Sequence, residues 1–453
     1  MFIPHEIPQS VALKLDEPRQ RAAVAIAERL RAAGHTVLLA GGCVRDLLIG
    51  RTPKDYDVAT SATPDQVLAL FPGANAVGKS FGVVIVVDEG VACEVATFRR
   101  DLAYADGRRP EGVVFSDPPT DAQRRDFTIN ALFLDPASGE ILDFVGGRAD
   151  LAAGILRAVG DPELRFAEDH LRLLRAARFA ATLGFTIEDG TAAAIRATAP
   201  QLARISVERI RDELSRTLLE AQDPGAALVM LDELGLLQVI LPEVTALKNV
   251  EQPPQFHPEG DVFRHTVMML TALPERELTL ALAVLLHDVG KPPTAEFRDG
   301  RWRFEKHASV GETMTRAILA RLRYPRETIE TVSFMVGNHM RFGDVRGMRR
   351  STLRRLVGAP SFAQELELHR LDCQASHGLV ENLDFLKSFQ DEMAREPVLP
   401  PPLITGRDLL ALGVQEGPEI GRWRRQAYDL QLEGAFCDRE SALAWLKKTM
   451  NDE

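Results

Sequence analysis

The segment 41–57 contains residue types suited to phosphate chemistry. A short apolar run ends at Gly41-Gly42, and apolar periodicity predicts a helix over residues 44–49. A glycine turn that leads into a helix presents free backbone N–H groups to a phosphate. Asp55 and Asp57 stand two residues apart in an expected second strand, which places both carboxylates on one face. Two such carboxylates can hold divalent metal against a bound phosphate, so the segment predicts a nucleotidyl-transfer site.

Two further segments carry side chains that can join this site. Glu94 interrupts a strand-like apolar run, where it is either a solvent-facing acid or a third metal-site or base carboxylate. Arg124 and Arg125 precede Asp126. The two arginines suit triphosphate or sugar contacts, and Asp126 can accept a hydrogen bond from a ribose hydroxyl. A helix-capping cluster of ion pairs is the structural alternative for this second segment.

The segment 168–178 suggests a device that selects bases. On a single helix, one acid and three arginines would follow each other at i, i+3 spacing: Asp169, Arg172, Arg175 and Arg178. Such a stripe is ordinarily a solvated row of ion pairs. Here Asp169 can instead accept a hydrogen bond from the exocyclic amine of cytosine or adenine, while Arg172 donates to the neighbouring ring nitrogen. Guanine and uracil present the opposite pattern and would leave buried polar groups unpaired, so the pair would select C and A without a nucleic-acid template.

Together these motifs resemble the class II CCA-adding enzymes (tRNA nucleotidyltransferases) and their bacterial poly(A) polymerase relatives. The resemblance covers about residues 30–245 and implies a small mixed-sheet nucleotidyltransferase head followed by an all-helical neck and body. It implies that Asp55 and Asp57 bind Mg²⁺, and it marks residues 204–214 as a helix-stabilising motif. It also implies a set of nucleotide-binding residues: Gly41, Gly42, Arg45, Arg124, Arg125, Asp126, Asn130, Asp169, Arg172, Arg175 and Arg178.

The same resemblance bears on how many nucleotides are added. In this family, CC-adding enzymes lack a flexible loop that must move before A can be added. The segment 101–110 fills that place, and Asp106, Arg108 and Arg109 are expected to act as its lever. The sequence therefore predicts complete CCA addition to the tRNA 3′ end from CTP and ATP, and it disfavours CC-only activity.

Histidines are concentrated in the second half of the chain, where seven of the ten lie between residues 257 and 377. One histidine on an apolar helix is usually a core residue, but an adjacent His-Asp pair with further His and Asp residues suits Mn, Fe, Ni, Co or Mg. The order resembles the HD phosphohydrolase superfamily over about residues 255–385, which implies an all-helical metal-dependent domain. The implied primary ligands are His265, His287, Asp288 and Asp372. His307 and His339 would complete a second metal position, and the remaining three of the block are expected to be structural: His257, His369 and His377.

Length and composition fit this α+β multidomain organisation. The chain has 453 residues, of which 45% are hydrophobic, and a net charge of −11, which argues against non-specific nucleic-acid binding and against DNA as a partner. No apolar run approaches the length of a membrane span, and the four scattered cysteines suit a reducing cytoplasm. The expected parts are an extension (1–20), the head (21–150), the neck and body (151–250), the HD domain (255–390) and a helical tail (400–453).

Three alternatives to CCA addition remain open from the sequence. The Asp169–Arg172 pair would accept A as readily as C, so A-only addition and poly(A) addition fit the same residues. From a different class, the chain would be an HD phosphodiesterase whose inactive head only binds RNA. The substrate and metal of the HD domain are also left open.

Overall fold

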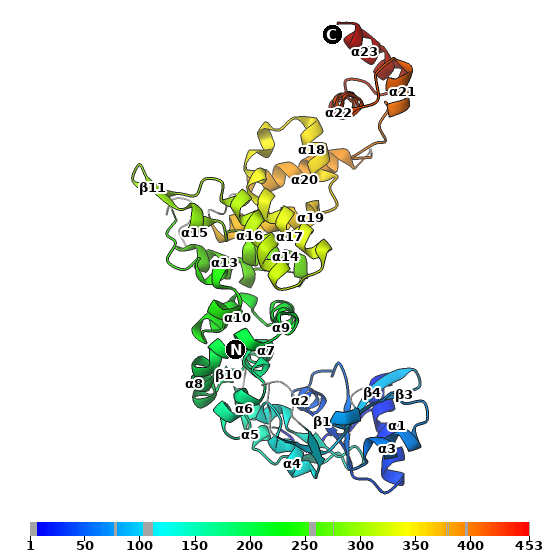
Figure 1. Cartoon of the computed structure of the whole chain (residues 1–453), viewed down its shortest axis with the longest axis vertical. Helices are drawn as coiled ribbons and strands as arrows, with labels where there is room; N and C mark the ends of the chain where they lie inside the picture. Colours follow the sequence, from blue (N-terminus) through cyan, green and yellow to red (C-terminus); the bar gives the residue numbers. More distant parts are fainter. Residues whose placement is uncertain are drawn as a thin grey trace. The chain divides into compact units, whose positions relative to one another are not determined.

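The computed structural model describes residues 7–76, 79–102, 112–252, 260–274, 276–376, 378, 380–394 and 397–452. The chain divides into two compact units, Met1–Thr245 and Ala246–Glu453 (Figure 1). Every helix among these described residues is too short or too polar to cross a membrane. The finer division into five parts stays a proposal.

A six-stranded mixed sheet forms the first part of unit 1. Its strand order is β3-β4-β2-β1-β7-β8, in which β2 and β4 run parallel and the other neighbours run antiparallel. β1 is buried along its whole length, as its apolar run predicts. The strands of this sheet are β1 (Val37–Ala40), β2 (Asp57–Thr60), β3 (Val83–Asp88), β4 (Val91–Thr97), β7 (Phe133–Leu134) and β8 (Ile141–Leu142).

Helix α1 (Pro18–Ala32) packs against the sheet strands, burying Ile26 and Leu30 (Figure 1). Proline at the first turn of α1 favours helix initiation, because its missing N–H has no partner to lose there. The other elements of this part are α2 (Gly42–Leu48), α3 (Pro64–Leu70), η1 (Lys79–Phe81), β5 (Arg99–Asp101), β6 (Val113–Phe115), α4 (Pro118–Gln123), η2 (Thr128–Asn130) and α5 (Gly147–Ala153).

The rest of unit 1 is helical, apart from one short parallel strand pair, β9 (Ile155–Leu156) with β10 (Thr186–Ile187). Helices α7 and α9 pack against each other, and α7 has apolar residues on one face and arginines on another. The helices are α6 (Pro162–Glu168), α7 (Leu171–Leu183), α8 (Asp189–Thr198), η3 (Ala199–Arg204), α9 (Val207–Glu220), α10 (Pro224–Glu233), α11 (Leu237–Ile240) and α12 (Pro242–Thr245).

Among the described residues of unit 2, the helices are interrupted by one hairpin, β11 (Glu296–Arg298) with β12 (Arg301–Arg303), which departs from the all-helical expectation. Helix α14 contains no charged residue and packs against α13, α17 and α19, which explains its almost complete burial. The first helices of this unit are α13 (Val262–Thr271), α14 (Leu278–Leu286), α15 (Lys291–Thr294), α16 (His307–Arg321), α17 (Arg326–Asn338), η4 (His339–Gly347), α18 (Arg350–Val357), α19 (Phe362–Ala375) and α20 (Glu381–Met393).

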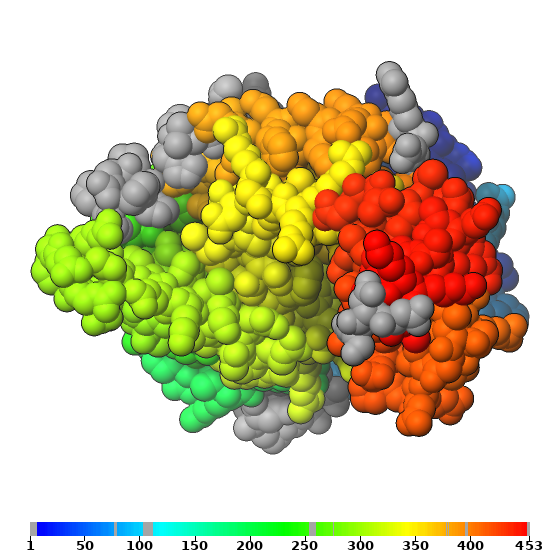
Figure 2. Space-filling model, turned by 90° about the horizontal axis from the view of Figure 1, so that it is seen from above, coloured from blue at the N-terminus to red at the C-terminus, as the bar shows by residue number. Residues whose placement is uncertain are grey.

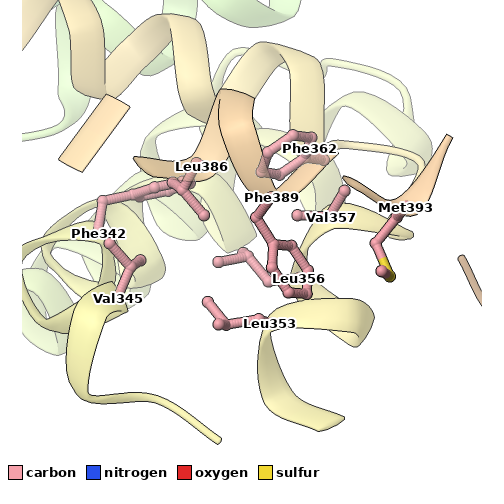
Figure 3. Close-up of a cluster of buried hydrophobic side chains, with 9 residues drawn as sticks. All are labelled: Phe342, Val345, Leu353, Leu356, Val357, Phe362, Leu386, Phe389 and Met393. Carbon is pink, nitrogen blue, oxygen red and sulfur yellow. The ribbon is translucent and has the colours of Figure 1, made fainter. Parts of the chain in front are cut away.

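Two hydrophobic cores stabilise the later part of unit 2. Figure 3 shows the first, in which side chains of η4, α18, α19 and α20 converge, with Phe342 and Leu386 fully buried. The second lies between the last three helices, around Trp423 and Leu446. The surface of these helices is coloured orange to red in Figure 2. These helices are α21 (Gly406–Ala411), α22 (Pro418–Glu433) and α23 (Arg439–Asp452). The expected fold class, a small mixed-sheet head followed by helical parts, is confirmed.

Candidate active site and metal centre

A cavity of about 800 Å³ in unit 1 gathers most of the residues singled out from the sequence. Its walls come from the α2 turn, the segment between α4 and η2, and helices α7 and α9. Asp55 and Asp57 line it, together with every predicted nucleotide-binding residue: Gly41, Gly42, Arg45, Arg124, Arg125, Asp126, Asn130, Asp169, Arg172, Arg175 and Arg178. Glu94 lines a smaller adjoining cavity of about 210 Å³, which Asp57 also lines.

Gly41 forms the turn between β1 and α2, with a φ of +78° that favours glycine. A Cβ at this position would lie 3.0 Å from Arg125 Nη1 and 3.9 Å from Asp57 Oδ2. The absence of a side chain therefore lets the turn approach both the guanidinium and the carboxylate closely.

Two of the head carboxylates, Asp57 and Glu94, lie on neighbouring strands, and Asp55 lies just before the first of these strands. β2 begins at Asp57, and Tyr56 is buried while Asp55 and Asp57 are exposed, so the two carboxylates point to the same side. Val58 pairs with Val95 in the parallel β2–β4 register, which places Asp57 beside Glu94. Although part of the Asp57 side chain is exposed, desolvation of its carboxyl group by the surrounding cavity wall, and then the negative charges of Glu94 and Asp55, raise the pKa of Asp57 to about 6, while Arg125 acts in the opposite direction.

This arrangement fits a cation that a bound nucleotide helps to hold. The ligand atoms of Asp55, Asp57 and Glu94 do not all lie within 4.8 Å of one another, so these three carboxylates alone do not make a complete metal site. Mg²⁺ is usually bound by one or two carboxylates together with substrate phosphates. A cation beside Asp57 would also offset the repulsion that raises the pKa of its carboxyl group.

Asp126 is the centre of a hydrogen-bond network. Arg175 donates to Asp126 Oδ2 from Nε and Nη2, at 3.0 and 2.7 Å, and Asn130 Nδ2 donates to Oδ1 at 3.1 Å. Burial opposes ionisation of Asp126, but Arg175, followed by Arg172 and Asn130, lowers its pKa to about 2. Arg45 extends the network by donating to Asn130 Oδ1 at 2.6 Å.

Asp121 is a residue that the sequence analysis missed. Its buried carboxylate accepts hydrogen bonds from Arg124 Nε at 2.8 Å and from Arg125 Nη2 at 3.0 Å. The sequence feature that could have identified Asp121 is its i, i+3 and i, i+4 spacing to the two arginines. Asp121 therefore fixes the direction of both guanidinium groups at the cavity wall.

The prediction that Asp169 shares one helix with the arginines is wrong. α6 ends at Glu168, Asp169 has extended backbone angles (φ −147°, ψ 105°), and α7 begins at Leu171. Asp169 Oδ1 accepts a hydrogen bond from Leu171 N at 3.0 Å, which satisfies a free donor at the start of α7. A side-chain acceptor at this place competes with the helical backbone, so the chain bends here.

Arg209 is a second missed residue. It lies in the segment expected to be only helix-stabilising, yet its guanidinium reaches Asp169, donating at 2.7 Å from Nη2 and at 3.2 Å from Nη1. Arg172 donates to the carboxylate of Glu168 and, at 2.7 Å, to Arg165 O. The expected base-reading residues, Asp169 and Arg172, are thus each held by another charged side chain.

The remaining arginines of α7 are anchored by α9. Arg178 is 2% exposed and donates to Glu213 Oε2 at 2.6 Å, while Arg175 Nη1 lies 3.9 Å from Glu213 Oε1. This geometry gives Arg178 a structural position at the cavity wall. The loop residues Asp106, Arg108 and Arg109 lie outside the described residues, as do His257 and His377.

The predicted metal ligands of unit 2 come together from five helical elements. They form two groups, within each of which the ligand atoms lie less than 4.8 Å apart. One consists of His265, His287 and Asp372, and the other of Asp288, His307 and His339. Asp288 lies within reach of both groups. His287 Nε2 is 3.1 Å from Asp288 Oδ2, so the two groups adjoin.

Backbone carbonyls orient three of these imidazoles. The Nδ1 atom of His287 lies 2.8 Å from Val284 O, that of His307 lies 2.8 Å from Phe304 O, and that of His339 lies 2.7 Å from Val336 O. A carbonyl only accepts, so each ring carries a proton on Nδ1, and in its neutral form it has a lone pair on Nε2. In metal sites, a ligating histidine usually donates its other ring N–H to such an acceptor, which fixes the tautomer and the orientation of the ring.

The electrostatics of the second group favour a cation. The Nε2 atoms of His307 and His339 lie 3.2 Å apart, and Asp288 Oδ1 lies 3.7 and 3.9 Å from them. Burial lowers the pKa of His307, and burial followed by the charge of His287 lowers that of His339 to about 4, so protonation at neutral pH is disfavoured. Two facing lone pairs beside a carboxylate therefore fit a divalent metal ion.

Lys291 and His265 pair with the two carboxylates. Lys291 Nζ is 2.7 Å from Asp288 Oδ2, and His265 Nε2 is 3.1 Å from Asp372 Oδ1. Burial opposes ionisation of both acids, yet His287 and Lys291 hold the pKa of Asp288 well below its usual range, and His265 lowers that of Asp372. Both acids are thus ionised and available as ligands. His369, expected to be structural, stacks on Phe342.

Comparisons with known proteins agree with this geometry. Residues 37–157 match the poly A polymerase head domain, residues 184–248 the probable RNA and SrmB-binding site of polymerase A, and residues 261–368 the HD domain. Nucleotidyltransferase and HD domains generally depend on divalent metal ions. The structure is similar to that of the Bacillus stearothermophilus CCA-adding enzyme in complex with CTP, with a TM-score of 0.72 and 26% identity over 96% of this chain and 98% of that one.

Two relatives of known sequence differ in how much of this chain they match. The CCA-adding enzyme of Geobacillus thermodenitrificans is 46% identical over 49% of this chain. The matched part spans about half (54%) of that relative's length. The CC-adding tRNA nucleotidyltransferase of Thermus thermophilus is 35% identical over 90% of this chain and 92% of its own length. The chain therefore belongs to the family of CCA-adding enzymes and tRNA nucleotidyltransferases.

Proposed function

We propose that this protein adds CCA to the 3′ end of tRNA, using CTP and ATP and no nucleic-acid template. The observation that carries the proposal is that one cavity holds both the paired carboxylates, Asp55 and Asp57, and the base-selecting pair, Asp169 and Arg172. The carboxylates suit phosphoryl transfer, and the second pair suits the donor and acceptor pattern that C and A share.

In the proposed reaction, the 3′-hydroxyl oxygen of the RNA forms a bond to the α-phosphorus of the nucleotide. The bond from that phosphorus to the oxygen bridging to the β-phosphate breaks, and pyrophosphate leaves with the electron pair. The hydroxyl proton passes to a carboxylate of the group formed by Asp55, Asp57 and Glu94. Divalent metal, Mg²⁺ in this proposal, would be held by Asp55 and Asp57 and would stabilise charge on the attacking and leaving oxygens.

The other contacts of the cavity position the nucleotide. Arg45, Arg124 and Arg125 suit the triphosphate, because guanidinium groups bind phosphate oxygens through two parallel hydrogen bonds. Asp126 carries a negative charge and can accept from a ribose hydroxyl. Asp169 would accept from the exocyclic amine through carboxylate lone pairs that Arg209 leaves free, and Arg172 would exchange Glu168 for the ring nitrogen.

CC-only addition is a second candidate, because the Thermus thermophilus relative matched over both units is a CC-adding enzyme. The segment that argues for CCA addition contains Asp106, Arg108 and Arg109, outside the described residues. The two activities differ in whether A follows the second C.

The test offers tRNA ending at the discriminator base, at C, or at CC, with CTP, ATP or both. Complete CCA addition predicts extension of all three tRNAs to one final length when both nucleotides are present. Products that stop at CC with ATP present would indicate CC-only addition. Extension only of the CC-ended tRNA would indicate A-only addition, and products beyond CCA would indicate poly(A) addition.

For unit 2 we propose metal-dependent phosphoester hydrolysis with Ni, Co, Mn or Mg. Histidine nitrogens and carboxylate oxygens fit these ions, and ions of this kind activate water toward phosphoesters. Metal-loaded protein should hydrolyse a 2′,3′-cyclic phosphate or a phosphate monoester. Protein that binds metal and hydrolyses neither would make this centre structural. We also propose a cytoplasmic location, which the four scattered cysteines support.

A further inference from the structure

Near the C-terminal ends of α7 and α9, the 800 Å³ cavity is lined by cationic residues that the nucleotide contacts leave unassigned. Lys54 directly precedes Asp55, Arg51 lies three residues before Lys54, and Arg216 comes from α9. These residues are absent from the network around Asp126. They therefore form a separate charged wall next to a proposed catalytic carboxylate.

The contacts of this wall leave its positive charge largely uncompensated. Lys54 Nζ and Arg216 Nε lie 3.0 and 3.3 Å from the same atom, Glu220 Oε1. Arg51 Nη1 donates to Thr182 O, a neutral acceptor, at 3.3 Å. Lys54 and Arg216 therefore share one acid, while Arg51 contacts a neutral oxygen, in a protein with a net charge of −11. The side chains of Lys54 and Arg216 are 77% and 47% exposed, so both are accessible to a ligand.

The proposed reaction requires two substrates on opposite sides of the reacting phosphorus, because attacking and leaving oxygens lie roughly in line. The nucleotide is assigned the end that contains the Gly41 turn, Arg124 and Asp126. The geometry points to the other end as the site of the attacking strand, where Arg51, Lys54 and Arg216 bind the ribose-phosphate backbone of the RNA 3′ end. This inference rests on the proposed function, since it assigns the second substrate of the same reaction.

Substitution of Lys54→Gln or Arg216→Gln removes a cation and keeps a polar side chain. Each variant should raise the KM for tRNA lacking its terminal CCA about five- to tenfold, while the KM for CTP stays within twofold. In nitrocellulose filter binding of the same tRNA, each variant should also reduce the slope of log affinity against log salt by about 0.7. A rise in the KM for CTP instead would assign these cations to the triphosphate and overturn the inference.

Two further variants separate RNA binding from a bracing role. Lys79→Gln removes a lysine that pairs with Asp65 at 2.6 Å outside the cavity, so it should change neither KM. Glu220→Gln removes the shared acid and keeps the cations, so tRNA affinity should stay the same or increase. If Glu220→Gln weakens tRNA binding as much as Lys54→Gln does, the ion pairs only brace α9 and the inference is wrong. Because filter binding needs no turnover, wild-type protein that binds tRNA without extending it would contradict the proposed function and leave the subsite measurable.

Discussion

Replacement of Arg209 by glutamine should weaken the choice between nucleotides more than it weakens nucleotide binding. Arg209 donates to both carboxylate oxygens of Asp169, at 2.7 and 3.2 Å, and so fixes the proposed acceptor for the exocyclic amine. In Arg209→Gln the Asp169 side chain loses this constraint, while Arg45 and Arg175 keep their own partners. We therefore expect the preference for CTP over UTP to fall.

The size of the effect follows from the lost hydrogen bonds. A hydrogen bond to a charged group contributes about 1.5–3 kcal/mol, and the two side chains here are 24% and 18% exposed, which reduces the pair's value. We take about 1.5 kcal/mol as the total, which corresponds to roughly a tenfold change in discrimination. Loss of an interaction that acts equally on every nucleotide would leave the ratio unchanged.

The assay is single-turnover extension of tRNA with each of the four nucleotides, giving kcat/KM for each. Arg196→Gln is a matched control, because Arg196 donates to Glu233 O on the surface and lies outside the cavity. Thermal unfolding checks that both variants are folded. A folded Arg209→Gln protein that slows all four nucleotides equally would refute the reasoning, and Asp169 would then not select bases.

Three other perturbations test separate parts of the structure. Glu213→Ala should lower the free energy of unfolding by about 3–5 kcal/mol in urea titrations, because it leaves Arg178 as a buried charge without its main partner. The folded-state pKa of Asp126 is about 2, below its ordinary value of 3.8, so its ionisation stabilises the fold above pH 4. That contribution, on the order of 2 kcal/mol, should disappear as the pH falls from about 4 to 2, and Asp126→Asn should lack this pH dependence in unfolding measurements. His287→Ala or Asp288→Ala should abolish metal-dependent phosphoester hydrolysis and leave tRNA extension near the wild-type rate, since their ligand groups belong to unit 2. Loss of tRNA extension in these folded variants would contradict that independence.

The sequence predicted those parts of the site that depend on local periodicity. The sequence predicted one strand through Asp55 and Asp57, and although β2 begins only at Asp57, Tyr56 between them is buried and both carboxylates are exposed as expected. The glycine turn was equally readable, because its residues adjoin an apolar strand and an apolar helix.

The break at Asp169 could not be predicted in the same way. The segment contains no proline or glycine, and its Leu, Ala and Arg residues favour a continuous helix. The bend depends on a hydrogen bond from Leu171 N and on Arg209, which lies 40 residues further along the chain. Contacts of this range depend on how α7 packs against α9, and periodicity does not specify that packing.

The candidate metal centre also combines features that the sequence predicted with features that it could not predict. The sequence supplied the six ligand residues, but packing of α13, α14, α16, α17 and α19 decides which atoms meet. Asp288 follows His287 directly, so the expectation placed the two in one set. The structure places Asp288 between the two sets, with Oδ2 3.1 Å from His287 Nε2 and Oδ1 3.7 Å from His307 Nε2.

The most direct test of the account is extension of tRNA ending at the discriminator base by wild-type protein and by Asp57→Ala. Asp57 lines the cavity beside Gly41 and Glu94, so its loss should remove metal-dependent stabilisation of the transferred phosphoryl group. We predict that the folded variant loses CTP and ATP incorporation by at least about a thousandfold, which corresponds to several kcal/mol. Robust incorporation of either nucleotide by folded Asp57→Ala protein would contradict the assignment of this cavity as the nucleotidyl-transfer site.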